Sequence, residues 1–451
     1  MFNRLILKPT TTFLFFKKYL FFVLITFFVC SCKKDSGSFI SKGSEKSFDF
    51  GSYTPKEFKV GTLDAQRKAN LQGQLETYYK DFWQAGGLWG GILVAHKGNI
   101  LLEKYSGFSS KETQKLIDNQ TPIHLASVSK VITATIMLKL IQSGDANLED
   151  KVIKYLPGFP YPKVTLKMLL NHRSGLPNYL YFSSDEEYWD KSKMLSNKDI
   201  LSLMIRHKIA PEFEADSRFA YSNTNYAMLA LVIEKITGTS FPKVLQEMIA
   251  KPLGMKNTFV FQMSDTLKAS QSHYYRGGKY PFDYLDNIYG DKNIYSTPRD
   301  MLAFDYALYD DKFLSKELKE LAYKGYSYER DGVKNYGLGM RIMEWENKKK
   351  LTYHNGWWHG NNTVFVHLPE DSTTIIALGN KYTRAVYSAM NLVSLFGEYP
   401  LEMVQREKAE KQAALEDSLR QIEIKDSLEK DSLLRLDSLK LKEKTLEKPK
   451  K

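Results

Sequence analysis

The chain has 451 residues, of which 43% are hydrophobic and 13% aromatic, a composition that fits a folded globular protein and excludes a disordered one. Its formal net charge is +12, but no basic stripe with interleaved aromatic residues is present, so we expect no nucleic-acid partner. The two cysteines, Cys30 and Cys32, both lie near the N-terminus, which excludes a disulfide framework in the body of the protein.

Residues 1–31 are predicted to form the signal peptide of a secreted lipoprotein. Basic residues come first, and the apolar run from Tyr19 to Val29 that follows is too short to span a bilayer. The run ends in Val29-Cys30-Ser31-Cys32, which resembles a bacterial lipobox, although Cys30 departs mildly from the usual pattern. We therefore expect a lipid on Cys32 to anchor the protein to a membrane of the bacterial cell envelope, in the periplasm or at the outer membrane. An uncleaved anchor helix is the alternative.

Residues 32–60 contain serine and glycine and are predicted to be a flexible tether to the folded domain, which we place at residues 61–400. The domain is predicted to begin with an amphipathic helix over 63–82. A β-hairpin is predicted next, over 91–96 and 100–105, because a Lys-Gly-Asn turn separates two runs of apolar and β-branched residues.

Helical patterns then dominate from about residue 127 to residue 322. Strands are predicted again over 351–353, 363–367 and 373–378, and a last helix over 384–396. Because strands from both ends of the domain flank a long helical middle, we expect an α+β fold, an α/β sandwich. One antiparallel sheet is built from both chain ends and flanked by helices, with an all-helical subdomain inserted and a cleft between the two parts.

The tail, residues 401–451, is rich in charged residues and repeats Asp-Ser-Leu at Asp417, Asp426, Asp431 and Asp437. Leucine and isoleucine recur there without a clean heptad, so a solvated or partner-dependent helix, or a disordered segment, is expected instead of a stable coiled coil. Binding of a protein partner by this tail stays open, and no chemistry is assigned to it.

The first motif whose residues are suited to catalysis is Ser127-Val128-Ser129-Lys130. It follows a strand-like stretch and begins an apolar helix. Lysine three residues after serine lies on the same helix face, one turn away. Because the helix is apolar nearly all round, Lys130 is expected to be buried, and a lysine removed from water can give up a proton and help to activate a serine. The alternatives are a helix cap for Ser127 and a surface position for Lys130.

The second motif, Tyr221-Ser222-Asn223, stands directly before another apolar helix. A tyrosine hydroxyl close to Ser127 and Lys130 can relay protons, and the Asn223 amide can bind a substrate carbonyl or orient the lysine. A helix cap and a packing role are the structural alternatives for these residues.

The third motif is His354-Asn355-Gly356, at the end of a predicted strand and followed by Trp357-Trp358. Glycine on an edge strand lets a substrate backbone approach and pair as an added strand. Imidazole can offer a positive or hydrogen-bonding group to a substrate carboxylate. A structural histidine in a tight turn is the alternative.

In this order the three motifs resemble those of the serine β-lactamase and penicillin-binding-protein family, in its class C, esterase and D-aminopeptidase-like branch. Stretches such as Leu169-Leu170-Asn171-His172-Arg173-Ser174-Gly175-Leu176-Pro177, Pro252-Leu253-Gly254-Met255 and Ser296-Thr297-Pro298-Arg299-Asp300-Met301 extend the resemblance, which runs from about residue 86 to residue 397.

The resemblance implies that Ser127 attacks a carbonyl and becomes acylated, with Lys130 and Tyr221 sharing the proton transfer in an order that the sequence leaves open. It also implies that Asn223 binds substrate, and that the backbone N–H groups of Ser127 and Trp357 form the oxyanion hole. His354, Asn355 and Gly356 are expected to line the opposite side of the site. No cofactor or metal is expected, since the eight histidines show no zinc-ligand spacing.

Three departures from the family pattern are visible. Asn355 replaces the usual hydroxyl residue of the third motif, Gly290-Asp291-Lys292-Asn293 replaces adjacent glycines, and Trp357 and Trp358 are bulky beside the expected oxyanion position. They favour an esterase, D-peptidase or cell-wall peptide amidase over a true β-lactamase. A catalytically inactive binding or scaffold lipoprotein is the other alternative. The lack of a Gly-x-Ser-x-Gly elbow and the order of the strands both argue against an α/β-hydrolase.

Overall fold

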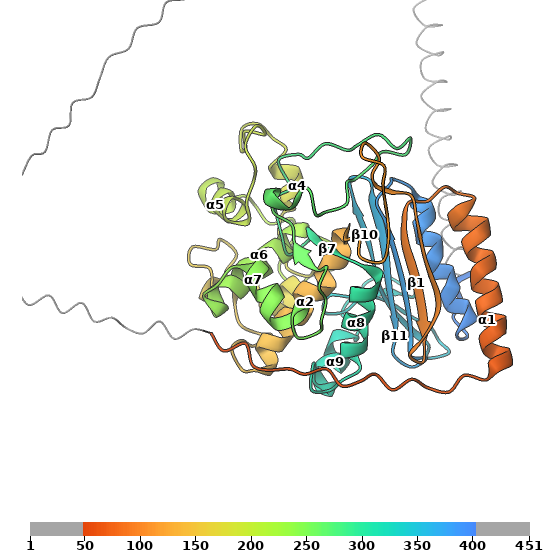
Figure 1. The fold of residues 1–451 in the computed structure, drawn as a ribbon. Helices are drawn as coiled ribbons and strands as arrows, with labels where there is room; N and C mark the ends of the chain where they lie inside the picture. Colours follow the sequence, from red (N-terminus) through yellow and green to blue (C-terminus); the bar gives the residue numbers. More distant parts are fainter. Residues whose placement is uncertain (1–47, 403–451) are drawn as a thin grey trace, which may run out of the picture. The chain divides into compact units, whose positions relative to one another are not determined.

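A seven-stranded antiparallel sheet runs through the centre of the computed structural model, which describes residues 48–402 (Figure 1). Its strand order is β2-β1-β12-β11-β10-β9-β8. The strands are β1 (Gly90–His96), β2 (Asn99–Ser106), β8 (Lys334–Tyr336), β9 (Arg341–Glu344), β10 (Lys350–Trp358), β11 (Asn361–Leu368) and β12 (Thr373–Gly379). The first hairpin therefore pairs with the last strand, which confirms the expected sheet built from both ends of the domain.

The two faces of the sheet are covered by different layers, as the alternation of side chains along β1 requires. Ile92 and Val94 join the core beneath α1 (Ala65–Tyr78) and η6 (Arg384–Leu395), whereas Leu93 and Ala95 join the core shared with the helical subdomain. Helix α1 begins at the cap Asp64 and continues as a π-helical turn over Tyr79–Gln84, and η6 is a 3₁₀ helix. On the other face α8 (Pro298–Leu308) packs against β1 and β12.

The helical subdomain lies on the α8 side of the sheet (Figure 1). Its helices are α2 (Ser129–Gln142), α3 (Leu166–Leu170), α4 (Tyr179–Phe182), α5 (Asn197–His207), α6 (Asn223–Thr237), α7 (Phe241–Leu245) with the π turn η4 (Gln246–Ala250), and α9 (Lys316–Ala322). Helices α2 and α6 are buried along almost their whole length and pack against each other. This explains why both sequences are apolar all round instead of amphipathic.

Short elements complete the described fold. A three-stranded sheet has the order β5-β7-β6, and β3 pairs with β4. These elements are β3 (Phe108–Ser110), β4 (Lys115–Leu116), β5 (Ile123–His124), β6 (Phe259–Val260), β7 (Ile294–Ser296), and the 3₁₀ turns η2 (Ala126–Val128), η3 (Val152–Lys154) and η5 (Met263–Asp265). Strand β5 leads directly through η2 into the start of α2.

Residues 48–60 differ from the prediction of a flexible tether, because they lie against the folded body. The Phe58 ring stacks on Tyr306 with 4.0 Å between ring centroids, and the Tyr53 hydroxyl donates to Asp310 at 3.0 Å. The contact area comes from aromatic side chains. The prediction of a tether rested on the serine and glycine content and gave these aromatic residues too little weight.

The predicted signal peptide, the lipidation site Cys32 and the tail beyond residue 402 lie outside the described residues. Among residues 48–402, no helix combines the length and the apolar character needed to cross a bilayer.

Candidate active site

Ser127 lies in a tight turn between strand β5 and helix α2. The turn is held on both sides, because the Leu125 N–H donates to the Ile294 carbonyl at 2.8 Å and the Ala126 N–H donates to His124 Nδ1 at 2.8 Å. Ala126 has a φ of +49°, in the left-handed region that residues other than glycine rarely adopt. Strain of this kind persists only where the surroundings enforce it, and it is frequent at functional turns.

The backbone N–H of Ser127 has no hydrogen-bond acceptor among residues 48–402. It therefore remains available to a substrate oxygen, as an oxyanion hole requires.

Lys130, one helical turn after Ser127, is fully buried, as expected from the apolar helix. Its Nζ donates to Ser127 Oγ at 3.1 Å, to Asn223 Oδ1 at 2.8 Å and to the Asp291 carbonyl at 2.8 Å. These three acceptors match the three N–H donors of an ammonium group. The structure thus brings Ser127, Lys130 and Asn223, which are up to 96 positions apart by their numbers, into one hydrogen-bonded cluster.

Tyr221 reaches the cluster through its ring instead of its hydroxyl. Lys130 Nζ lies 5.1 Å from the centroid of the Tyr221 ring, and the Arg341 guanidinium carbon lies 4.9 Å from the same centroid. No hydrogen bond joins the Tyr221 hydroxyl to Ser127 or Lys130 in the described part of the chain. The proton acceptor from Ser127 therefore stays open between Lys130 and Tyr221.

His354 of the third motif is fully buried, with both ring nitrogens engaged. Nε2 lies 3.1 Å from the Tyr336 hydroxyl, and Nδ1 lies 2.8 Å from the Asn355 carbonyl. Burial lowers the pKa of His354 well below its ordinary value, and the nearby charges of Arg341 and Lys130 lower it further. A neutral, buried imidazole does not supply the positive group that the sequence suggested, which corrects that half of the expectation.

Gly356 is packed so closely against the Ser127 turn that no side chain fits. A Cβ at this position would overlap Thr363 Oγ1 and lie 2.5 Å from the Leu125 carbonyl oxygen and 2.9 Å from the Ala126 Cβ. Gly356 therefore sets the distance between strand β10 and the residue that precedes Ser127.

One edge of β10 beyond Tyr353 carries no neighbouring strand. Strand β9 pairs with β10 only over Lys350–Tyr353, whereas β11 pairs with it as far as Trp358. Asn355 Oδ1 is buried there without a hydrogen-bond partner, and the Trp357 side chain is 61% exposed. This free edge beside Gly356 agrees with the expectation that a substrate backbone can pair here.

Arg341, on the neighbouring strand β9, is a functional candidate that the sequence interpretation missed. It lies directly across from Tyr353, at the last β9–β10 pair, and makes no ion pair with any carboxylate of residues 48–402. Burial opposes its charge, but the surrounding hydroxyls of Tyr221, Tyr353 and Tyr336 raise the pKa of Arg341. The sequence does contain a signal for Arg341: it is the single charged residue within the apolar stretch from Leu338 to Met343.

The Arg341 guanidinium borders a cavity of about 450 Å³. Its lining includes three further basic side chains and three aromatic ones, namely Arg218, Arg330, Lys334, Phe219, Tyr336 and Tyr353. The carboxylate in this lining, Glu329, is paired with Arg173. An unpaired guanidinium in a basic cavity is suited to bind an anionic group.

One group of side chains within residues 48–402 has the composition of a cation site. Ligand atoms of Asp283, Asp286 and His359 lie within 4.8 Å of one another. The Asp286 carboxylate already accepts hydrogen bonds from Trp358 Nε1 at 2.7 Å and from the Asp283 N–H at 2.6 Å, and His359 Nε2 lies 3.0 Å away. The cluster is explained by these hydrogen bonds, and we assign no metal to it.

Comparison with known proteins agrees with this arrangement. Residues 75–394 match the family described as Beta-lactamase. The chain is 31% identical over 378 residues to penicillin-binding protein 4* of Bacillus subtilis, covering 78% of this chain and 82% of that protein.

Solved structures share the fold at lower identity. A penicillin-binding protein from Bacillus halodurans superimposes with a TM-score of 0.63 at 23% identity, covering 71% of this chain and 98% of that one. The D-amino acid amidase from Ochrobactrum anthropi superimposes with a TM-score of 0.59 at 22% identity, covering 76% of this chain and all of that one.

Proposed function

The chain belongs to the beta-lactamase family and is a serine hydrolase, and on that premise we propose that it cleaves an ester or amide whose leaving group carries a carboxylate. The observation that carries this proposal is the unpaired Arg341 in a basic cavity, in contact with Tyr221 beside the Ser127–Lys130–Asn223 cluster. D-peptides, cell-wall peptides and small acidic esters are the substrates that fit this description.

In the proposed reaction Ser127 Oγ attacks the substrate carbonyl carbon, and its proton passes to the lone pair of Lys130 in its neutral amine form or to Tyr221 in its phenolate form. Asn223 orients Lys130 Nζ, with which it is hydrogen bonded at 2.8 Å, and offers its amide N–H to the substrate. The N–H groups of Ser127 and Trp357 stabilise the oxyanion. The tetrahedral intermediate then expels the leaving group, which takes up the proton and leaves Ser127 acylated. Water hydrolyses this ester and restores the serine.

Arg341 is proposed to bind the carboxylate of the leaving group. A guanidinium presents paired N–H donors that match a carboxylate, and such hydrogen bonds to a charged group are each worth about 1.5–3 kcal/mol. The basic side chains around the cavity raise the local concentration of anionic substrates. Because His354 is neutral, the cation of this side that contacts Tyr221 beside Ser127 is Arg341.

We propose that the enzyme works in the bacterial cell envelope, held there by a lipid on Cys32. The lipobox-like sequence Val29-Cys30-Ser31-Cys32 supports this location, and so does the similarity to a penicillin-binding protein. Globomycin treatment of expressing cells, followed by mass analysis of the N-terminal peptide, tests the anchor independently of the catalytic proposal.

The catalytic proposal is tested with an acylated D-alanyl-D-alanine and its C-terminal amide, which differ only in the carboxylate. We expect hydrolysis of the free acid at a kcat/KM about tenfold or more above that of the amide, and no hydrolysis of either by Ser127→Ala. Equal rates for the two compounds would exclude carboxylate recognition. If neither is cleaved but penicillin is turned over, the protein is a β-lactamase; no reaction with any acyl donor would leave a binding role.

A further inference from the structure

The segment Gly290–Asn293 crosses over helix α2 beside the catalytic cluster and is held to it by backbone carbonyls. The Gly290 carbonyl accepts from Thr133 Oγ1 at 2.7 Å, and the next carbonyl, that of Asp291, accepts from Lys130 Nζ at 2.8 Å. Gly290 has a φ of +91°, and a side chain there would overlap the backbone of Tyr226. The Asp291 carbonyl is thus one of the three acceptors that hold Lys130 Nζ in place.

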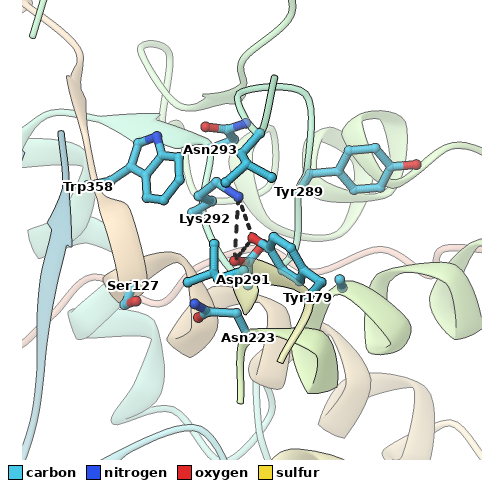
Figure 2. Close-up of polar contacts among 12 residues, drawn as sticks. Ser127, Tyr179, Asn223, Tyr289, Asp291, Lys292, Asn293 and Trp358 are labelled. Carbon is cyan, nitrogen blue, oxygen red and sulfur yellow. Dashed lines mark hydrogen bonds and ion pairs between the residues drawn. The ribbon is translucent and has the colours of Figure 1, made fainter. Parts of the chain in front are cut away.

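The Asp291 side chain turns the other way and enters a buried polar network with Tyr179 and Lys292 (Figure 2). The Tyr179 hydroxyl donates to Asp291 Oδ2 at 2.7 Å and accepts from Lys292 Nζ at 2.5 Å. Lys292 Nζ also lies 3.7 Å from Asp291 Oδ2. These three residues are exposed by 3% or less, so the network is closed to solvent.

Tyr179 connects this network to the second half of the catalytic cluster. Its backbone N–H donates to Thr224 Oγ1 at 2.8 Å, and Thr224 directly follows Asn223 at the start of helix α6. Asp291 and Asn223 are the two residues that hold Lys130 in addition to Ser127. Tyr179 therefore contacts the first of them directly and the neighbour of the second through its backbone N–H.

Stability does not account for an ionic network at this place. Removing two charges from water costs more than apolar residues of the same size would, and pairs of this kind are often neutral or unfavourable for folding. This pair is also incompletely satisfied, since Asp291 Oδ1 is buried without a partner. An arrangement that contributes little to folding but fixes one carbonyl beside Lys130 is better explained by a role in the reaction.

We propose that Tyr179, Asp291 and Lys292 are positioning residues of the hydrolase: they fix the Asp291 peptide group so that its carbonyl holds Lys130 Nζ against Ser127 Oγ. This inference rests on the proposed role of Ser127 as the nucleophile but not on the identity of the substrate. Lys292 acts as the counter-charge of Asp291, and its ammonium also packs on the Trp358 ring, 4.5 Å from the centroid.

The test compares Asp291→Asn, Lys292→Met and the double variant carrying both changes. Each single change leaves one buried charge unpaired and lowers the unfolding temperature, whereas the double change removes both charges and restores most of that loss. We expect all three variants to acylate Ser127 with a fluorophosphonate about tenfold more slowly than the wild type or worse, because a displaced Lys130 no longer assists the attack. The reagent concentration that gives half the maximal rate is expected to stay unchanged.

Asp305→Asn serves as the matched control, because Asp305 is equally buried in another polar network, with His367 at 2.8 Å and Thr374. This change is expected to destabilise the fold while leaving the acylation rate unaltered at a temperature where the protein is folded. Recovery of both stability and acylation rate in the double variant would overturn the proposal, since the network would then be only an ion pair. Absence of labelling in the wild type would instead refute the hydrolase assignment, so the two failures are distinguishable.

Discussion

The two sides of the active site hold their polar groups in different ways. On the helical side, Ser127, Lys130 and Asn223 are joined by direct hydrogen bonds of 2.8–3.1 Å. On the strand side, His354 is buried and neutral, and Arg341 points to a cavity without a carboxylate partner. The helical side is thus preassembled for bond breaking, whereas the strand side is left unsatisfied in the way a binding surface requires.

This difference predicts which kinetic constant each side controls. Changes on the helical side remove groups that stabilise the transition state, and they lower kcat. Changes on the strand side remove contacts with the bound substrate, and they raise KM.

Lys130→Met is expected to have the largest effect, a loss of about 10³-fold in kcat, because residues that act as one catalytic unit fail together when one is removed. The measurement is the rate of acylation of Ser127 by a chromogenic ester under single-turnover conditions.

Lys139→Met is the matched control for this change, since Lys139 is a second, partly buried lysine of helix α2 whose Nζ donates to the Phe313 carbonyl at 3.1 Å. It is expected to acylate at the wild-type rate. A similar loss of acylation rate in both variants would show that the loss comes from disturbing helix α2 and not from removing the catalytic amine.

Arg341→Met is expected to weaken the binding of carboxylate-bearing substrates by about 2 kcal/mol, a rise in KM of roughly thirtyfold, with kcat nearly unchanged. A neutral ester provides the internal control, because its KM should not move. A parallel loss of kcat for both substrates would mean that Arg341 acts through Tyr221, with which it is in contact, and the division between the two sides would not hold.

Gly356→Ala is expected to push β10 away from the Ser127 turn, because the added Cβ lies 2.5 Å from the Leu125 carbonyl oxygen. Overpacking of this kind destabilises a fold by about 1–3 kcal/mol, to be measured by urea unfolding, and acylation should fall with it.

Gly73→Ala makes the same chemical change in helix α1, where the new methyl group meets nothing within 4 Å. It should stabilise the protein by about 0.5–1 kcal/mol. An unaltered stability of Gly356→Ala would show that the strand side is not tightly coupled to Ser127.

The last prediction is a pH dependence of stability, to which each of three buried histidines contributes. Burial lowers the pKa of His124 to about 4 and that of His172 and His354 well below the ordinary value. Because the unfolded chain binds protons near pH 6.5 and the folded state does not, stability is full above pH 6.5 and falls as the pH is lowered. Each histidine contributes a slope of up to about 1.4 kcal/mol per pH unit between its two pKa values.

Urea unfolding at pH 7 and pH 5.5 measures this slope in a range above the titration of ordinary carboxylates. His354→Gln is expected to reduce the slope of stability against pH by the contribution of one histidine. Equal stability at the two pH values would contradict a neutral, buried His354 on the strand side.

The helical side could be predicted from the sequence because its spacing is local. A serine and a lysine three residues apart share a helix face wherever they occur, and the apolar residues around Lys130 predicted its burial. The sheet was also predictable, since hydrophobic strands at both ends of the domain require each other as partners. Asn223 was recognised in the sequence as part of a separate motif. Its position beside Lys130 depends on the packing of α6 against α2.

The strand side was predicted less well because its geometry comes from pairing between strands. His354 was expected to offer a charge, but its depth in the core became visible only in the fold, and the charge is on Arg341 of the adjacent strand. Asp291 and Lys292 were noticed only as departures from a family pattern. Their meeting with Tyr179, 112 and 113 positions earlier, carries no sequence signal.

The most direct test of the account is intact-mass spectrometry of the protein after incubation with a fluorophosphonate, with Ser127→Ala as the comparison. We predict one covalent adduct, located on Ser127 by peptide mapping and missing from the alanine variant. No adduct on folded wild-type protein, or an adduct that persists in Ser127→Ala, would contradict the assignment of Ser127 as the nucleophile.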